Sequence, residues 1–241
     1  MTINKYTAIS GRALSKVLGL AALDTAEAVR RNYAWQAFAG CWDRLTLDTY
    51  MGDNGRYRYR RYGQFRYDAL TSSLHLLPHE PYVQPRAINR LNGDIQRHFD
   101  PLETALTESP ILFNLLREMA AIYSAADGYT SNWRIRLHPY RITGSTGAPG
   151  KPTPEGLHRD GVTYIASLMV ARRNITGGIT RVTTNDRRML TSVRLTEPLD
   201  LLISDDASTM HEVSEVRSLD GHSPSFRDVL VIAFERMDAF G

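Results

Sequence analysis

The sequence predicts a mainly β protein, an all-β sandwich or barrel with helices packed on one sheet. Three observations support this. From residue 132 onward, short runs rich in Val, Ile, Thr and Leu are separated by turn residues, as in all-β domains. Before that point the apolar residues recur at helical spacing. Helices first and strands second indicate helices on one face of a sheet, because an alternating α/β fold would interleave them.

The predicted strands follow one another closely after residue 132. They cover residues 133–142, 162–172, 179–184, 188–195, 199–204, 210–216 and 228–235, with a short extended piece at 155–160. The Gly- and Pro-containing stretch 144–154 is expected to be a loop that leads into this extended piece.

Helices are predicted in the first half of the chain. Residues 19–42 carry an apolar stripe at helical spacing, and residues 88–106 give a weaker helical pattern. The clearest signal begins at Ser109-Pro110, which suit the N-cap and first helical position, and ends at Gly128.

Composition limits the class of protein. The chain has 241 residues, 42% of them hydrophobic, and we expect a single domain in which 1–130 is a helical flank and 131–241 the β core. The lone Cys41 excludes an internal disulfide and fits a reducing cytoplasm. A net charge of +3 does not favour an obligate nucleic-acid binder. No apolar run has the length of a membrane span or secretory signal, so no membrane partner is expected.

An arginine- and tyrosine-rich stretch at 56–62 is predicted to form a strand within the helical flank. Its arginines would share one face and its tyrosines the other. Three interpretations remain open: a solvated strand with buried tyrosines, a cationic site for a small carboxylate, or a surface for single-stranded nucleic acid.

The strongest functional signal is Pro-Glu-Gly-Leu-His-Arg-Asp-Gly at 154–161. On an extended chain His158 and Asp160 point to the same side. His211, on a later apolar strand, is the best candidate for a third metal ligand. Two histidines and one carboxylate with open positions form the ligand set of non-heme Fe(II) oxygenases. Asp205 and Asp206 are alternatives to Asp160, although Asp-Asp before a strand is usually a turn.

A 2-oxo acid co-substrate of such a centre would need a cation for its far carboxylate. Arg227 stands where the last predicted strand begins, and an antiparallel return would place it beside the strand of His211. Its guanidinium suits a bidentate carboxylate. The hydroxyl of Thr180 could also contact the co-substrate, although an ordinary β-branched strand residue is the slightly favoured interpretation.

Residues 132–235 resemble the bacterial Fe(II)/2-oxoglutarate dioxygenases that include L-isoleucine 4-hydroxylase and related free L-amino-acid hydroxylases. The matching segments are Pro-Glu-Gly-Leu-His-Arg-Asp-Gly at 154–161, Arg-Arg-Asn-Ile-Thr-Gly-Gly at 172–178, Glu-Pro-Leu-Asp at 197–200, Asp-Asp-x-x-x-x-His-Glu-Val at 205–213 and Phe-Arg-Asp-Val-Leu-Val-Ile at 226–232. The resemblance implies a double-stranded β-helix (jelly-roll, cupin-like) core, Fe(II) held by His158, Asp160 and His211, and 2-oxoglutarate anchored by Arg227.

The expected reaction is hydroxylation of a small substrate, most simply a free L-amino acid, using O2 and releasing succinate and CO2. Glu155, Arg60 and His138 are candidate substrate-binding residues, with Glu155 and Arg60 suited to an amine and a carboxylate. Two rival hypotheses stay open: an oxygenase that acts on nucleic acid, and a jelly-roll binding or stress-response protein without turnover. The sequence does not determine the oligomeric state.

Overall fold

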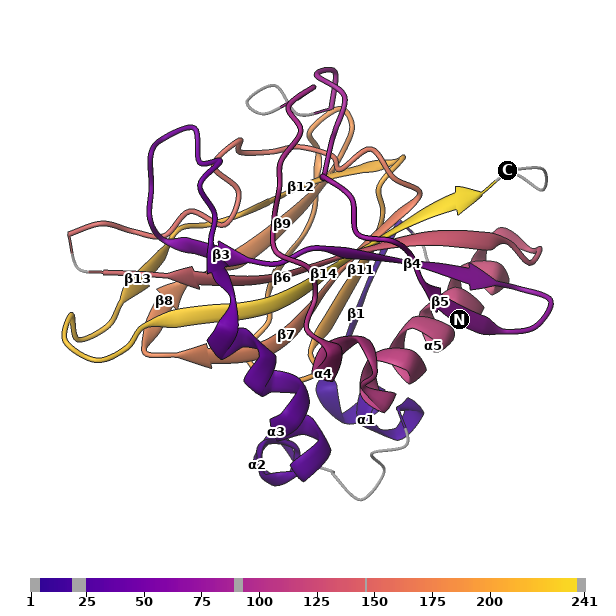
Figure 1. Ribbon diagram of the computed structural model, residues 1–241. Coiled ribbons are helices and arrows are strands. Elements are labelled where there is room, and N and C mark those ends of the chain that lie inside the picture. The colour runs from indigo at the N-terminus through magenta and orange to yellow at the C-terminus, as the bar shows by residue number, and fades with distance from the viewer. Residues whose placement is uncertain (1–4, 19–24, 89–92, 146, 238–241) are drawn as a thin grey trace.

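The computed structural model describes residues 5–18, 25–88, 93–145 and 147–237 (Figure 1). Its helices are α1 Gly11–Val17, α2 Ala26–Arg31, α3 Tyr33–Ala39, α4 Thr104–Thr107 and α5 Pro110–Asp127, with a 3-10 turn η1 at Gly40–Arg44. Its strands are β1 Tyr6–Ile9, β2 Thr46–Leu47, β3 Arg58–Arg60, β4 Gly63–Asp68, β5 Ser73–Leu76, β6 Asn132–Thr143, β7 Tyr164–Arg173, β8 Ile175–Gly177, β9 Ile179–Thr184, β10 Met189–Arg194, β11 Leu201–Asp205, β12 Thr209–Val213, β13 Val216–Ser218 and β14 Phe226–Met237.

Two antiparallel sheets face each other across the interior. Within the described residues, the large sheet has nine strands, with the order β1-β11-β7-β14-β6-β3-β2 and with β4 and β5 branching from β6. The smaller of the two has three strands in the order β10-β9-β12, and β13 pairs with β8 in a separate two-stranded sheet. Met169 and Val229 of the large sheet pack with Val182 of the small one in a shared apolar cluster. The predicted mainly β architecture is therefore confirmed.

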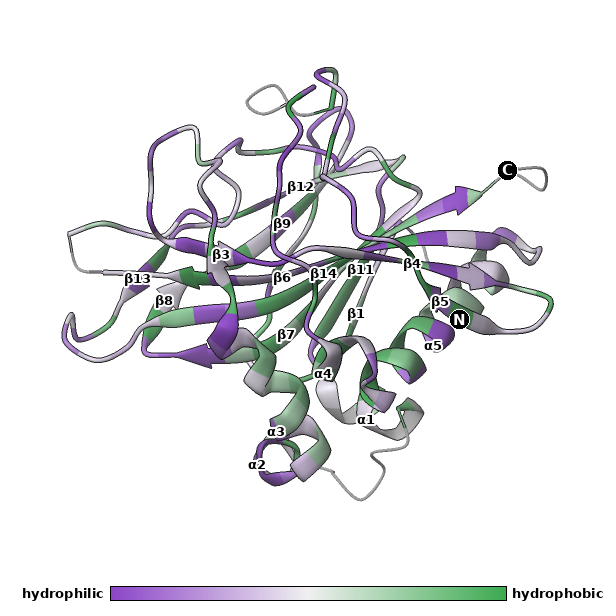
Figure 2. Ribbon diagram, in the orientation of Figure 1, coloured by the Kyte–Doolittle hydropathy of each residue, from purple (hydrophilic) through white to green (hydrophobic). Residues whose placement is uncertain are grey.

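The helices cover the outer face of the large sheet (Figure 1). The alternation of side chains along β14 explains this layering, because successive residues of a strand point to opposite faces. Leu230, Ile232 and Phe234 pack with α5 in the main core, whereas Val229 and Val231 line a cavity on the inner face. In Figure 2 the apolar residues gather along the middle of β7, β11 and β14, the strands of the large sheet that pack against the helices.

The best-predicted helix is α5. Ser109 is its N-cap residue, Pro110 opens it, and Gly128 ends it in the left-handed conformation with φ of 78°. Its predicted apolar stripe is buried against the sheet.

Two other helix predictions were wrong in part: the first segment is helical on both sides of one break, and the second is helical only from Thr104. The predicted helix at 19–42, of which 19–24 lie outside the described residues, is divided at Asn32, whose extended backbone ends α2 and whose side chain accepts a hydrogen bond from the Trp35 N–H to start α3. The predicted helix at 88–106 is also wrong over most of its described part, where the backbone of Arg97 pairs with Tyr82 and helix begins only at Thr104.

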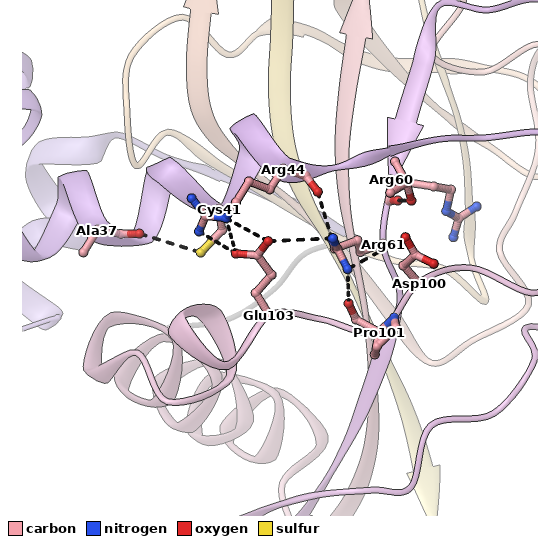
Figure 3. A network of polar contacts seen from close by, with 9 residues as sticks. Ala37, Cys41, Arg44, Arg60, Arg61, Asp100, Pro101 and Glu103 are labelled. Atoms are coloured by element: carbon pink, nitrogen blue, oxygen red, sulfur yellow. Dashed lines mark hydrogen bonds and ion pairs between the residues drawn. The ribbon is translucent and has the colours of Figure 1, made fainter.

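The 97–103 segment is fixed to η1 by a polar network (Figure 3). Arg44 donates from Nε to both oxygens of Glu103 at 2.8 and 2.7 Å, and Arg61 donates to the carbonyl of Pro101 at 2.9 Å. Arg60, the neighbour of Arg61 on the chain, points away from this network in Figure 3. The network therefore holds the segment that follows Arg97 against the strand that carries Arg60.

No helix among the described residues is long and apolar enough to cross a membrane.

Candidate metal centre and co-substrate pocket

The backbone brings His158 and His211 together. His211 lies on β12, and its N–H donates to the carbonyl of His158 at 2.9 Å, while the N–H of His158 donates back to the carbonyl of His211 at 3.0 Å. The ring centroids are 4.5 Å apart. The predicted short strand at 155–160 does not form, because a turn with Gly156 at φ of 74° leaves only this isolated bridge.

Asp160 completes the group of three predicted ligands. Its Oδ2 lies 3.4 Å from Nε2 of His211, and one ligand atom from each of His158, Asp160 and His211 lies within 4.8 Å of the other two. All three side chains line the inner cavity. Among the described residues, no second group of three such side chains has this spacing. The donor set fits a divalent metal held on one side and open on the other.

Hydrogen bonding and burial decide which nitrogens of the two imidazoles can bind a metal. Nδ1 of His158 lies 2.8 Å from the carbonyl of Gly156, which can only accept, so Nδ1 carries a proton and Nε2 is the nitrogen that a metal can bind. Burial lowers the pKa of His211 to about 3, helped by the charge of His158, which leaves its imidazole neutral. Burial also acts on His158, but Asp160 and Glu155 outweigh it and raise its pKa.

Asp206 organises the ligand loop from outside the metal position. Its carboxylate accepts hydrogen bonds from the backbone N–H groups of Asp160 at 3.0 Å, Gly161 at 2.7 Å and Val162 at 3.0 Å. Asp205 accepts bonds from Ala207 and Ser208 in the following turn. The sequence alternative in which Asp205 or Asp206 replaces Asp160 is therefore not supported, because both carboxylates are occupied elsewhere.

Arg227 lies on the inner face of β14 with polar atoms that lack partners. Its side chain is buried, and within the described residues its Nε and Nη2 have no hydrogen-bond partner. Burial lowers its pKa to about 10, and the charge of Arg172 adds to the shift. On β9, the hydroxyl of Thr180 is also buried without a partner in the described chain. These unpaired donors fit the carboxylate of a bound co-substrate, because buried polar groups are normally hydrogen-bonded.

Arg172 is a functional candidate that sequence reasoning missed. It pairs directly with Arg227 across β7 and β14. Its Nη2 donates to the carbonyl of Gly177 at 2.9 Å, whereas its Nη1 is buried with no partner among the described residues. Gly178 makes room for both arginines, since a Cβ there would lie 3.0 Å from Nη1 of Arg172 and 3.1 Å from Cδ of Arg227. Only the strand register reveals this pair of cations.

The three predicted substrate-binding residues all line the same cavity as the metal ligands and Arg227. Glu155 is exposed, whereas Arg60 and His138 are buried. Arg60 contacts Nδ1 of His138 through Nη2. Burial lowers the pKa of His138 well below its usual value, and Arg60 adds to the shift, so His138 is neutral and accepts this bond.

The interpretation of 56–62 as a solvated strand with buried tyrosines was wrong. Arg58 and Arg60 are 6% and 1% exposed, while Tyr57 and Tyr59 are only half-buried. The sheet register explains the inversion: Arg58 pairs with Ile142 and Arg60 with Tyr140, whose side chains line the cavity.

A two-sheet β core that presents two histidines, one carboxylate and a buried arginine to one cavity defines the class of non-heme iron oxygenases that use a 2-oxo acid. The sequence profile of the 2OG-Fe dioxygenase family matches residues 39–233. The chain belongs to this family. It is an enzyme that uses Fe(II), 2-oxoglutarate and O2, and the sequence-based recognition of the family is confirmed.

Individual relatives agree with this assignment. The 3(1)-hydroxy-L-isoleucine 4-dioxygenase of Pantoea ananatis strain AJ13355 is 26% identical over 217 residues, which cover 89% of this chain and 82% of the relative. The crystal structure of a bsmA homolog from Methylobium petroleophilum PM1 has a TM-score of 0.83 and 30% identity, covering 96% of this chain and 88% of the other. IDO from Bacillus thuringiensis, with a TM-score of 0.75, 17% identity and coverages of 98% and 92%, shares the fold. The jelly-roll core is confirmed.

Proposed function

We propose that this dioxygenase hydroxylates a free L-amino acid. His158, Asp160 and His211 would hold the iron, and Arg227 with Thr180 would bind 2-oxoglutarate. With iron bound, the site supplies the oxidative decarboxylation of 2-oxoglutarate to succinate and CO2, with one oxygen atom of O2 entering a C–H bond of the substrate. The amino-acid class is supported by the relative that is named a hydroxyisoleucine dioxygenase.

One observation carries the proposal: a single cavity presents both charge signs needed for a zwitterion next to the candidate metal ligands. Arg60 and Glu155 both line the cavity, where Arg60 is buried and Glu155 is exposed to solvent. An amino acid with its carboxylate toward Arg60 and its ammonium group toward Glu155 would have both charges met. Its side chain would then have the apolar lining of Ile165, Val229 and Val231 available.

The chain's own residues divide the remaining work. Arg227 orients the co-substrate by its far carboxylate, because a guanidinium binds a carboxylate in a fixed bidentate geometry. The bond from Nδ1 of His158 to the carbonyl of Gly156 fixes the tautomer of the neutral ring, so that Nε2 is the ligating nitrogen. Val229 and Val231 present apolar surface beside the reacting groups, which limits water there.

The buried position of the arginines argues against a nucleic-acid substrate. Arg58 and Arg60 are 6% and 1% exposed, so their guanidinium groups do not form a surface that could follow a phosphate backbone.

The test is anaerobic reconstitution with Fe(II), followed by addition of 2-oxoglutarate, O2 and each proteinogenic L-amino acid in turn. Succinate is measured together with the hydroxylated product. At least one amino acid should raise succinate formation above the rate without substrate and yield one hydroxylated product per succinate. If no amino acid stimulates turnover while a methylated oligonucleotide does, the proposed substrate class is wrong.

A further inference from the structure

Three buried arginines form a second cationic site in the cavity. They are Arg58 and Arg60 on β3 and Arg97 on the segment before α4, and they are named the arginine cluster below. We propose that the arginine cluster is a subsite that binds the carboxylate of the substrate, separate from the site of Arg227. This inference rests on the proposed function and deepens it by naming Arg97 as a residue that recognises the substrate.

The strand order separates the two cationic sites. Arg58 pairs with Ile142 on β6, and Ile142 pairs with Arg227 on β14, so a whole strand lies between the two arginines. Neighbouring strands are about 4.8 Å apart, which puts the backbones of Arg58 and Arg227 roughly 10 Å from each other. One carboxylate cannot serve both sites in the bidentate geometry that guanidinium groups favour.

The arginine cluster carries more positive than negative charge. Arg58 forms an ion pair with the buried Asp48 at 2.8 Å, but Arg60 comes no closer than 3.9 Å to that carboxylate. Arg97 donates to the neutral side chain of Gln84 at 2.8 Å and has no ion pair within the described residues. Among the described residues, Asp48 is thus the one carboxylate in an ion pair with these three guanidinium groups, although the charge of Glu155 also acts on Arg58. Burying a charge without a partner is costly, so an anion that enters this space is stabilised.

Unsatisfied hydrogen-bond donors support the same conclusion. Arg60 and Arg97 are 1% and 3% exposed, and the Nε of each has no partner in the described part of the chain. His138 accepts a hydrogen bond from Arg60 but brings no negative charge, because its imidazole is neutral. Burial also lowers the pKa of Arg60, as expected for a cation that lacks compensation.

Aromatic rings hold the guanidinium groups in place without neutralising them. The guanidinium carbon of Arg60 lies 3.8 Å from the ring centre of Phe99, and that of Arg97 lies 4.6 Å from the ring centre of Tyr82. Such contacts fix a cation and stabilise it modestly. The cluster is thereby arranged before any ligand arrives, which favours the binding of a small rigid anion.

A hydrogen-bond chain connects the arginine cluster to the candidate metal centre. Gln84 accepts from Arg97 at 2.8 Å and donates from Nε2 to the carbonyl of Asp160 at 3.4 Å. A carboxylate bound at Arg97 would thus lie one side chain away from the backbone of a metal ligand. The rest of a small amino acid would then lie beside the side chains that would hold the metal.

Acetate tests the subsite without knowledge of the substrate. The full chain, loaded with Zn(II) in place of iron and saturated with 2-oxoglutarate to fill the site of Arg227, is labelled with 15N-arginine and titrated with acetate. The Nε–H signals of Arg60 and Arg97 should shift, assigned through Arg60→Lys and Arg97→Lys. The signal of Arg136, which lines the same cavity but is paired with Glu235 at 2.8 Å, should stay in place. If neither Arg60 nor Arg97 responds, the subsite does not exist.

Calorimetry on the same loaded protein then connects the subsite to the substrate. For the amino acid that gives the most succinate, the wild type should prefer the free acid to its carboxamide by about 10- to 100-fold, as expected for charge-assisted hydrogen bonds. Arg97→Gln should remove most of this preference, and the matched control Arg136→Gln should keep it. Equal preference in wild type and Arg97→Gln would overturn the assignment of Arg97.

The two proposals fail in different ways. If acetate shifts Arg60 and Arg97 but no amino acid stimulates succinate formation, the subsite stands and the amino-acid substrate is wrong. If amino acids are hydroxylated but acetate leaves both signals unchanged, the proposed function stands and the subsite is wrong.

Discussion

The backbones of His158 and His211 form two reciprocal hydrogen bonds, with N···O distances of 3.0 and 2.9 Å. The pair is an isolated bridge, because His158 lies outside any strand. The two imidazoles are therefore brought together by the main chain. A change in either side chain leaves these two bonds intact. Loss of metal binding in a ligand variant can thus be measured in a protein that remains folded.

Asp206→Asn should weaken metal binding. The amide nitrogen that replaces one carboxylate oxygen cannot accept from the backbone N–H groups of Asp160, Gly161 and Val162, so the ligand loop loses part of its support. We expect the dissociation constant for Co(II) to rise about 10- to 100-fold. Asp205→Asn is the matched control, because Asp205 serves only the next turn. Similar Co(II) affinities in the two variants would contradict the assigned role of Asp206.

Gly178→Ala should weaken 2-oxoglutarate binding. The new Cβ would lie 3.0 Å from Nη1 of Arg172 and 3.1 Å from Cδ of Arg227, so both side chains must shift slightly. The backbone of Gly178 has φ of 65°, which costs any other residue about 1–2 kcal/mol. Gly128→Ala carries the same backbone cost at φ of 78°, with open space around its Cβ. Both variants should lose a similar amount of thermal stability. In calorimetry, however, only Gly178→Ala should show a several-fold loss of affinity for 2-oxoglutarate.

Arg172 and Arg227 should both contribute to the affinity for 2-oxoglutarate, but unequally. Within the described residues Arg227 has two buried nitrogens without a partner, whereas Arg172 has one and donates from Nη2 to the carbonyl of Gly177. Arg227→Met should raise the dissociation constant of 2-oxoglutarate by about 10- to 100-fold, from the loss of charge-assisted hydrogen bonds. Arg172→Met should raise it less. An unchanged constant in Arg227→Met, measured with Zn(II) bound, would refute its role as anchor.

The stability of the metal-free protein should depend on pH through Asp228. Burial raises the pKa of Asp228 from 3.8 to about 6, although the paired Arg141 opposes this. The folded state thus holds the proton more tightly than the unfolded state, and its contribution to the unfolding free energy falls as pH rises from 4 to 7. The full effect is about 3 kcal/mol.

Urea unfolding of wild type and Asp228→Asn at several pH values measures this contribution. The unfolding free energy of the wild type should fall relative to the variant as pH rises through 6. A difference that is flat, or that grows with pH, would show that Arg141 outweighs burial at this carboxylate.

Local sequence patterns predicted the parts of the fold that local physics decides. The strand β9 matches its expected bounds of 179–184, and α5 begins and ends at its predicted capping residues. The break at Asn32 was not predicted, because an asparagine can lie within a helix or cap the start of a new one with its side chain. Whether the arginines of β3 face solvent or a small carboxylate stayed open in the sequence, because burial of Arg58 and Arg60 depends on the register with β6.

The same contrast between local patterns and long-range contacts applies to the residues of the candidate site. His158 and Asp160 were found from their spacing, and the structure places His211 beside them. Asp206 was predicted only as an alternative metal ligand, and Arg172 and Arg97 were given no role, because the fold alone brings them beside Asp160, Arg227 and Tyr82 respectively. Arg97 in particular lies in a segment whose helical pattern was misleading, and its backbone pairs with Tyr82.

The most direct test of the central claim is iron binding and turnover in one set of proteins. Wild type, His158→Ala, Asp160→Ala and His211→Ala are reconstituted anaerobically with Fe(II), and bound iron and succinate released from 2-oxoglutarate are measured. Wild type should bind one iron per chain and release succinate, and the variants should remain folded but lose both. Variants that bind iron and release succinate as the wild type does would contradict the assignment of His158, Asp160 and His211 as the metal centre.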